Sequence, residues 1–206
     1  IFWCRIWVSK AFKINYENYI IPFCLFLVFG KVQIYFALAA SSVALSEGMN
    51  LVSASQLLRN YKSSPGKMRM TKGIKNSWII DNTKDSHPYS MREALSILSK
   101  IGKEKRKVAV LGDVLDSDQE PTSVHEELGR TAAGACDLMF AIGPRAKFLA
   151  EGAKESGMEK VYHYYDPDQA KKEIQKEMKE GDLVLIDASK EISMDKILKE
   201  IQFIKL

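Results

Sequence analysis

The sequence predicts an α/β protein in which a doubly wound, mostly parallel sheet in residues 67–206 follows a smaller α+β piece in residues 1–66. Short apolar runs alternate with helix-length amphipathic segments along the second part of the 206-residue chain. The intervening Ser-Ser-Pro-Gly at residues 63–66 is typical of a linker. Charge divides in the same way, because residues 1–70 carry eight Lys and Arg against two acids, whereas the remaining residues carry 22 against 24.

The first part of the chain predicts a hairpin followed by two helices. The expected strands are residues 12–16 and 19–27, and the expected helices are residues 33–45, ending near Gly48, and 51–61. Glu17 and Asn18 favour a hairpin turn, and Pro22 favours an edge position or a bulge because it has no N–H to donate. The apolar run of this strand is shorter than the roughly 20 residues of a membrane span, so a buried strand and helix are favoured.

The second part predicts five strands that alternate with five helices. The strands are residues 78–81, 107–111, 138–142, 160–164 and 182–186, and the helices are residues 90–101, 124–134, 145–156, 168–179 and 194–201. Continuous apolar strands joined by helices are typical of a parallel sheet covered on both faces. Right-handed crossovers make such a sheet doubly wound.

The composition of the chain indicates which classes of protein it can belong to. Apolar residues make up 46% and charged residues 27% of the chain, which is typical of a globular protein. The three cysteines are scattered and form no CxxC, which argues against a disulfide framework and a zinc site and favours a cytoplasmic protein. The small basic excess of the first part fits either a neighbouring acidic surface or an anion or nucleotide face. We expect no nucleic-acid partner.

Ligands of an open α/β sheet bind beyond the carboxyl ends of its strands. The residues just after the predicted strands are Asp81 to Thr83, Gly112 with Asp113, Gly143, Asp166, and Asp187 to Lys190. For Gly143 and Asp166 an ordinary turn or helix cap is favoured. For Asp81 and Asp113 a functional role is slightly favoured, because their turns are longer and more polar.

Two histidines leave alternatives open, and two nucleotide motifs are missing. His87 precedes Pro88, which holds its backbone extended; this fits a loop side chain aimed at a cleft and equally a helix N-terminus. His125 is more typical of a capping or surface histidine than of a general base. The sequence contains neither GxGxxG after a strand nor GxxxxGK[ST], so it has no dinucleotide fingerprint and no P-loop.

Five segments, in order along the chain, resemble motifs of the Mur ligase family, in its D-alanyl-D-alanine-adding group. The motifs are G-x-H-x-x-x-N-A-L-A-A, P-G-R-M, I-D-D-x-Y-N-A-N-P-x-S-M, A-V-L-G-D-M-x-E-L-G…H and L-V-K-G/A-S-R. They match residues 30–40, 64–68, 79–91, 108–116 with His125, and 183–190. The resemblance implies that residues 1–66 are a remnant of the ATPase domain and that residues 67–206 are the Rossmann-like C-terminal domain.

The resemblance also implies a reaction and a set of ligands. The family uses ATP and Mg²⁺ to form an acyl phosphate on a UDP-MurNAc-peptide, which the amine of D-Ala-D-Ala then attacks. By this resemblance Lys67, Asp81 and Asn82 are expected on the ATP side, and the loop from Asp81 to Pro88 is expected to open on a nucleotide-sized cleft. The expected substrate-binding residues are His87, Ser90, Asp113 and His125. No catalytic residue and no metal ligand is assigned.

Several motif positions depart from the family pattern. Val32 and Phe36 replace a His and an Asn, and neither side chain can form a hydrogen bond. Lys67 replaces an Arg and keeps the charge without the two-pronged donor geometry. Asn82 replaces an Asp, and Asp187 replaces a Lys, which reverses the charge at a strand end. Because the P-loop is missing as well, we expect ATP binding by this chain to be doubtful and the chain alone to be inactive.

Two rival hypotheses belong to other functional classes. The chain could be a non-catalytic interaction module that uses the same cleft or self-associates through residues 1–29, which hold two Trp and seven Phe or Tyr. It could also be an unrelated small-molecule enzyme on a similar sheet. A pocket that contains a strongly shifted titratable residue would favour the latter.

Overall fold

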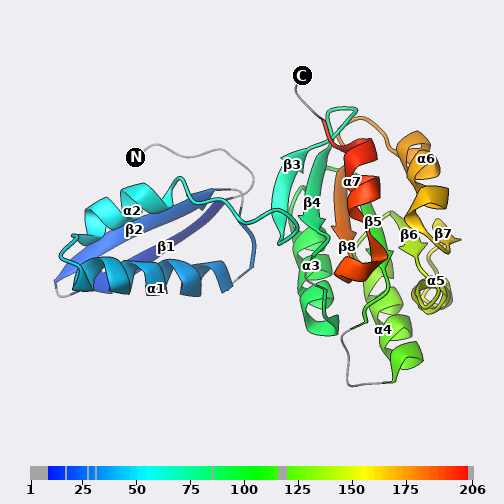
Figure 1. The fold of residues 1–206 in the computed structure, drawn as a ribbon, viewed down its shortest axis with the longest axis horizontal. Helices are drawn as coiled ribbons and strands as arrows, with labels where there is room; N and C mark the ends of the chain where they lie inside the picture. Colours follow the sequence, from blue (N-terminus) through cyan, green and yellow to red (C-terminus); the bar gives the residue numbers. More distant parts are fainter. Residues whose placement is uncertain are drawn as a thin grey trace. The chain divides into compact units, whose positions relative to one another are not determined.

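The computed structural model describes residues 9–16, 18–26, 28–30, 32–84, 86–115 and 120–203. Contacts divide the chain into two compact units, Ile1–Ser64 and Pro65–Leu206, which we call unit 1 and unit 2 and describe separately. Figure 1 traces the elements in order, from the blue strands of unit 1 to the red helix that closes unit 2. Among the described helices, none is both long enough and apolar enough to cross a membrane.

Unit 1 consists of a hairpin and two helices, as predicted. Its elements are β1 (Ser9–Tyr16), β2 (Tyr19–Phe26), α1 (Val32–Ser46) and α2 (Leu51–Leu58). The antiparallel register runs without a bulge and places Pro22 opposite Lys13. Because this sheet has two strands, both are edge strands, which confirms the edge position predicted for Pro22. Of the predicted turn residues, Glu17 lies outside the described residues.

The core of unit 1 is small. Leu25, Val28 and Ala37 form its buried centre, with Phe12 and other partly buried side chains packed around it. The rings of Phe12 and Phe23, which are paired across the hairpin, stack with their centroids 5.3 Å apart. A hairpin with one helical layer therefore supplies this unit with a single thin core.

Unit 2 contains a six-stranded sheet of order β3-β4-β8-β5-β6-β7. The strands are β3 (Arg69–Lys72), β4 (Trp78–Asn82), β5 (Lys107–Gly112), β6 (Leu138–Ile142), β7 (Val161–Tyr164) and β8 (Leu183–Asp187). The five predicted strands are present and pair in parallel. The edge strand β3, which was not predicted, pairs antiparallel with β4. The predicted doubly wound, mostly parallel sheet is confirmed.

Helices cover both faces of this sheet, so its strands are apolar on both sides. The helices are α3 (Pro88–Lys100), α4 (Pro121–Ala133), α5 (Ala146–Glu155), α6 (Pro167–Glu177) and α7 (Asp195–Ile201). One face packs Val108 and Val110 of β5 against Ile174 of α6 and Ile197 of α7. The alternate strand residues point to the opposite face, where α3 contacts β8 and α5 contacts β5.

Proline sets the start of three of these helices. Pro88, Pro121 and Pro167 each occupy the first turn, where a missing N–H costs nothing. The apolar pattern alone placed these starts one to three residues too late, because it is blind to this first turn. Asp166 caps α6 by accepting a hydrogen bond from the Gln169 N–H at 3.0 Å, which confirms the cap predicted there.

Two glycines let α4 and α5 approach each other closely. A Cβ on Gly129 would lie 2.1 Å from the carbonyl oxygen of Leu149, and a Cβ on Gly152 would lie 2.1 Å from that of Glu126. Real Cβ atoms do not approach backbone so closely, so no side chain fits either position without moving a helix. The glycines therefore fix the distance between these helices.

Candidate functional site

The carboxyl end of β4 forms hydrogen bonds with the first residues of unit 2. The Asp81 carboxylate accepts hydrogen bonds from the Gly66 N–H at 2.8 Å and from the Thr83 hydroxyl at 2.8 Å. The Asn82 side-chain oxygen accepts one from the Met68 N–H at 3.2 Å. Asp81, Asn82 and Thr83 are buried. The expectation that this part of the loop opens on a cleft is therefore wrong, because these side chains are buried and form hydrogen bonds within the chain.

Gly66 completes this contact from the other side. Its carbonyl accepts a hydrogen bond from the Lys84 N–H at 3.1 Å. Its φ of +81° is in the left-handed region, and a Cβ there would lie 2.5 Å from the Lys84 side chain. The neighbouring Lys67, predicted on the ATP side, is exposed. Of the three predicted ATP-side residues, Lys67 is the exposed one, whereas Asp81 and Asn82 are buried.

His87 and Ser90 lie together at the start of α3 and form a capping box. The Ser90 hydroxyl accepts a hydrogen bond from the His87 N–H at 2.8 Å, and the His87 ring accepts one from the Tyr89 N–H at 3.3 Å. His87 remains exposed, as does the Tyr89 side chain. Of the two alternatives for His87, the structure has the helix N-terminus.

Asp113, just after β5, supplies a side-chain cap to the start of helix α5. Its carboxylate accepts a hydrogen bond from the Arg145 N–H at 3.2 Å at the start of α5, where Arg145 itself provides no side-chain cap. Its other oxygen, Oδ1, is buried and has no hydrogen-bond partner among the described residues. Burial raises the pKa of Asp113 above its usual value, although the backbone N–H donors at the start of α5 and the charge of Arg145 oppose this.

His125 is fully buried, which excludes the surface position considered for it. Its Nε2 accepts a hydrogen bond from the Val114 N–H at 3.1 Å, so this nitrogen carries no proton. Its Nδ1 lies 2.6 Å from the Pro121 carbonyl oxygen and therefore carries the proton that it donates. Both ring nitrogens are occupied, and the imidazole ties the segment after β5 to α4.

Ser189 is a residue of this region whose role the motif did not reveal. Its hydroxyl accepts a hydrogen bond from the Leu115 N–H at 2.9 Å, and its own N–H donates to the Asp113 carbonyl at 3.0 Å. Ser189 and His125 therefore hold residues 113–115 from two sides. The position of Ser189 just beyond β8 was the feature of the sequence that could have identified it as part of this region. The motif positions Asp85 and Asp116 lie outside the described residues.

The sheet brings the predicted strand-end acids to one edge. Asp187 pairs in register with Asn82 on one side and with Leu111 on the other. Asp81 directly precedes Asn82, and Asp113 follows Leu111 by two residues. Asp187 is fully buried. No group of three or more His, Cys, Asp or Glu among the described residues is arranged to hold a metal ion. The described side-chain oxygens at this edge do not by themselves fit a magnesium-bound triphosphate, because most of them accept hydrogen bonds from the protein's own backbone.

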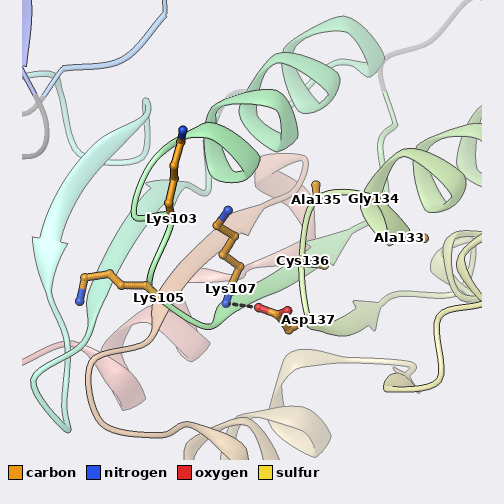
Figure 2. A pocket seen from close by; sticks show the side chains of 8 residues that line it. All are labelled: Lys103, Lys105, Lys107, Ala133, Gly134, Ala135, Cys136 and Asp137. Atoms are coloured by element: carbon orange, nitrogen blue, oxygen red, sulfur yellow. Dashed lines mark hydrogen bonds between the residues drawn. The ribbon is translucent and has the colours of Figure 1, made fainter.

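A cavity of about 300 Å³ opens at the opposite edge, at the amino ends of β5 and β6 (Figure 2). Lys103, Lys105 and Lys107 line one side of it, and residues 133–137 line the other. Burial raises the pKa of the Cys136 thiol there to about 12. Such a thiol stays protonated and is a poor nucleophile, so this shift does not favour an unrelated enzyme.

Comparison with known proteins agrees with this fold. The family described as Mur ligase, glutamate ligase domain, matches residues 68–190. The UDP-N-acetylmuramoyl-tripeptide–D-alanyl-D-alanine ligase of Bacillus subtilis is 26% identical over 176 residues, which are 84% of this chain and 38% of that protein. The ligase of the same name from Buchnera aphidicola is 27% identical over 196 residues, covering 94% of this chain and 41% of that protein.

Solved structures of this kind superpose on both units. MurF from Acinetobacter baumannii matches with a TM-score of 0.81 and 23% identity over 93% of this chain and 42% of that one. MurF from Thermotoga maritima, solved in complex with ADP, matches with a TM-score of 0.73 and 20% identity over 93% of this chain and 45% of that one. The chain spans about two fifths of the length of these relatives. On the match to more than half of its residues, the chain belongs to the Mur ligase family.

Proposed function

We propose that this chain forms the carboxyl-terminal part of a cytoplasmic Mur ligase. That ligase joins D-alanyl-D-alanine to a UDP-MurNAc-tripeptide in peptidoglycan precursor synthesis. In this reaction ATP converts a substrate carboxylate into an acyl phosphate. The dipeptide amine then forms a C–N bond at that carbon while the C–O bond to phosphate breaks. The observation that supports the proposal is the similarity to the UDP-N-acetylmuramoyl-tripeptide–D-alanyl-D-alanine ligase of Buchnera aphidicola, which runs through 94% of the chain.

We propose further that residues 1–206 alone do not catalyse this reaction. The sequence has no P-loop, and Val32 and Phe36 stand at motif positions that call for hydrogen-bonding side chains. Asp81 and Asn82 are bonded to the linker, and both nitrogens of His125 are occupied. The exposed residues Lys67 and His87 remain candidates for ligand contacts at this edge of the sheet, whereas the Ser90 hydroxyl bonds to the backbone of His87.

A chimera tests the function that we assign to unit 2. Residues 65–206 would replace their counterpart in the Bacillus subtilis ligase, and joining of D-Ala-D-Ala to UDP-MurNAc-tripeptide would be followed by phosphate release. We expect ligation slower than that of the parent enzyme and dependent on both substrates. A folded chimera that forms no product contradicts the proposal, and product formation by residues 1–206 alone contradicts the predicted inactivity.

The second candidate is a non-catalytic interaction module, including self-association through residues 1–29. It is favoured by one observation, the large exposed apolar side chains of unit 1, among them Tyr19 and Ile20 at the hairpin tip. Residues 1–8 of this segment lie outside the described residues. Sedimentation of the purified chain separates the candidates: a monomer at micromolar concentration without detergent contradicts self-association.

A further inference from the structure

The cavity at the amino ends of β5 and β6 has an excess of positive charge. The loop that joins α3 to β5 reads Lys-Glu-Lys-Arg-Lys at residues 103–107, and Lys103, Lys105 and Lys107 line the cavity. Asp137 is the one acidic residue among the described residues of the lining. The lining therefore carries three positive charges against one negative charge.

The lysines of this cavity lack the carboxylate partners that other lysines of unit 2 have. The ammonium group of Lys105 donates a hydrogen bond to the Gly181 carbonyl at 2.8 Å, and that of Lys107 donates one to the Ser99 carbonyl at 2.6 Å. A carbonyl is neutral and uses one of the three N–H donors of an ammonium group, so charge and donors remain for a ligand. The lysines of α6 and α7 that pair with carboxylates are Lys171, Lys172, Lys176, Lys196 and Lys199.

The arginine of the same loop is engaged elsewhere. The Arg106 guanidinium donates a hydrogen bond to the Glu177 carbonyl at 2.9 Å, and its Nε lies 3.7 Å from the carboxylate of the buried Asp182. A planar carboxylate ligand is best bound by the two-pronged guanidinium, whereas ammonium groups act as point charges that suit phosphate oxygens. The cavity offers lysines and no arginine, which favours phosphate as the ligand chemistry.

The basic loop is held in place by the protein itself. Gly102 adopts a left-handed φ of +55°, and its carbonyl accepts a hydrogen bond from the Lys105 N–H at 2.8 Å. The Lys107 N–H donates to the Asp137 carboxylate at 2.7 Å, and the Asp137 N–H donates to the Lys107 carbonyl at 2.9 Å. Because these bonds exist without a ligand, binding would cost little ordering of the loop.

The oxygen atoms on the opposite wall, which would repel an anion, are bonded within the protein as well. The Ala132 carbonyl in the last turn of α4 accepts hydrogen bonds from the N–H groups of Ala135 and Cys136 at 2.9 and 3.1 Å. One oxygen of the Asp137 carboxylate is occupied by the Lys107 N–H. These bonds offset the partial negative charge at the end of α4 and reduce its effect on an anion.

We propose that this cavity binds a small anion that carries phosphate groups, with Lys103 and Lys107 as its contacts. In Figure 2 these two side chains extend in the same direction, whereas Lys105 extends away from residues 133–137 and adds charge from a greater distance. A volume of about 300 Å³ suits a small ligand. The site lies at the edge of the sheet opposite the strand-end acids, so the inference does not rest on the proposed function.

Calorimetric titration of residues 1–206 with pyrophosphate tests the site. We expect one pyrophosphate to bind per chain with a Kd below about 1 mM, and binding to weaken as salt is added. In amide NMR spectra the largest shifts should occur at residues 103–107 and 134–137, which would place the ligand in the cavity. No saturable binding at about 10 mM pyrophosphate would overturn the inference.

Three lysine variants locate the binding more closely. Lys103→Gln should weaken binding about fivefold or more, because it removes a charge that faces the ligand. Lys103 is exposed, so this variant leaves the packing of unit 2 intact, and Lys103→Arg, which keeps the charge, should retain binding. Lys147→Gln is the matched control, since it removes the same charge from an exposed position on α5 at the other edge of the sheet. Equal weakening by Lys103→Gln and Lys147→Gln would overturn the inference.

Further probes test the chemistry of the ligand. Citrate has a similar charge but no phosphate, and binding as tight as that of pyrophosphate would overturn the assignment to phosphate. A hexose phosphate that binds more tightly than inorganic phosphate would support an ester as the ligand, and the reverse order would support the free anion. Ligation by the chimera tests the proposed function separately, because pyrophosphate binding does not depend on it.

Discussion

The two units of this chain use similar apolar side chains to opposite effect. In unit 2, helices on both faces of the sheet bury the residues of the inner strands, as at Phe140. In unit 1, one hairpin and one helical layer leave comparable residues such as Phe36 in water. An apolar residue becomes core only where a second layer covers it. The contrast shows that unit 2 buries these side chains between its layers, whereas the described residues of unit 1 leave several of theirs exposed.

Replacing one phenylalanine in each unit tests this contrast most strongly. Phe140→Ala should lower the free energy of unfolding by about 3–5 kcal/mol, because it opens a cavity between covered layers. Phe36→Ala should change it by no more than about 0.5 kcal/mol, since the side chain is already exposed. Urea unfolding followed by circular dichroism measures both. Equal losses would show that α1 is covered after all.

The close contact at the glycines of α4 and α5 tests whether the distance between these two helices in unit 2 is fixed. Gly129→Ala should cost about 1–3 kcal/mol, because its methyl group would collide with the backbone of α5. Gly134→Ala is the control, since the nearest atom to its Cβ would be 3.8 Å away, an ordinary contact. The melting temperatures of the two variants make the comparison. A Gly129 variant as stable as the control would mean that the helices separate freely.

The hydrogen bond between the Gly66 N–H and Asp81 tests whether Asp81 stabilises the fold. Asp81→Ala should cost about 1–3 kcal/mol, because the buried Gly66 N–H loses its acceptor. Amide hydrogen exchange at Gly66 should accelerate in this variant and stay slow in Ser64→Ala, a neighbouring exposed position. Unchanged exchange at Gly66 would leave Asp81 free for a ligand and would argue for the ATP-side role predicted from the sequence.

The smallest expected effect concerns pH. Because burial raises the pKa of Asp113 in the folded state, the folded protein holds this proton more tightly than the unfolded chain does. The stability of the natural protein relative to Asp113→Asn should therefore fall as the pH rises from about 3.9, the usual Asp pKa, through the raised folded value. Urea midpoints of both proteins at several pH values measure this. A difference that grows in favour of the natural protein over this range would contradict a raised pKa.

Local signals in the sequence were enough for most of the fold. Apolar runs such as residues 107–111 and 182–186 fixed the parallel strands, because a strand covered on both faces must be apolar throughout. Strand β3 was missed because Arg-Met-Thr-Lys is short and polar, and because its partner β4 defines it more than its own composition does. The 3₁₀ turn Lys190–Ile192 was missed as well, because three residues are too short for an apolar pattern.

For the candidate site, the sequence predicted where the acidic residues lie better than it predicted their hydrogen-bond partners. Asp81, Asp113 and Asp187 do come to one edge of the sheet, because parallel strands end together. Asp81 and Asp113 accept hydrogen bonds from the backbone N–H groups of Gly66 and Arg145, which reach them only through the tertiary fold. A motif shows which residue type stands at a strand end but not whether a ligand or the chain itself satisfies it.

The paired glycines of α4 and α5 carry a consequence for related sequences. Each glycine faces backbone of the other helix, so a side chain at Gly129 or at Gly152 alone would push both helices apart. Once the helices have moved, the second position is released from its restriction as well. Substitutions at these two positions should therefore occur together among relatives, and a relative with a single exchange should show a wider groove between the two helices.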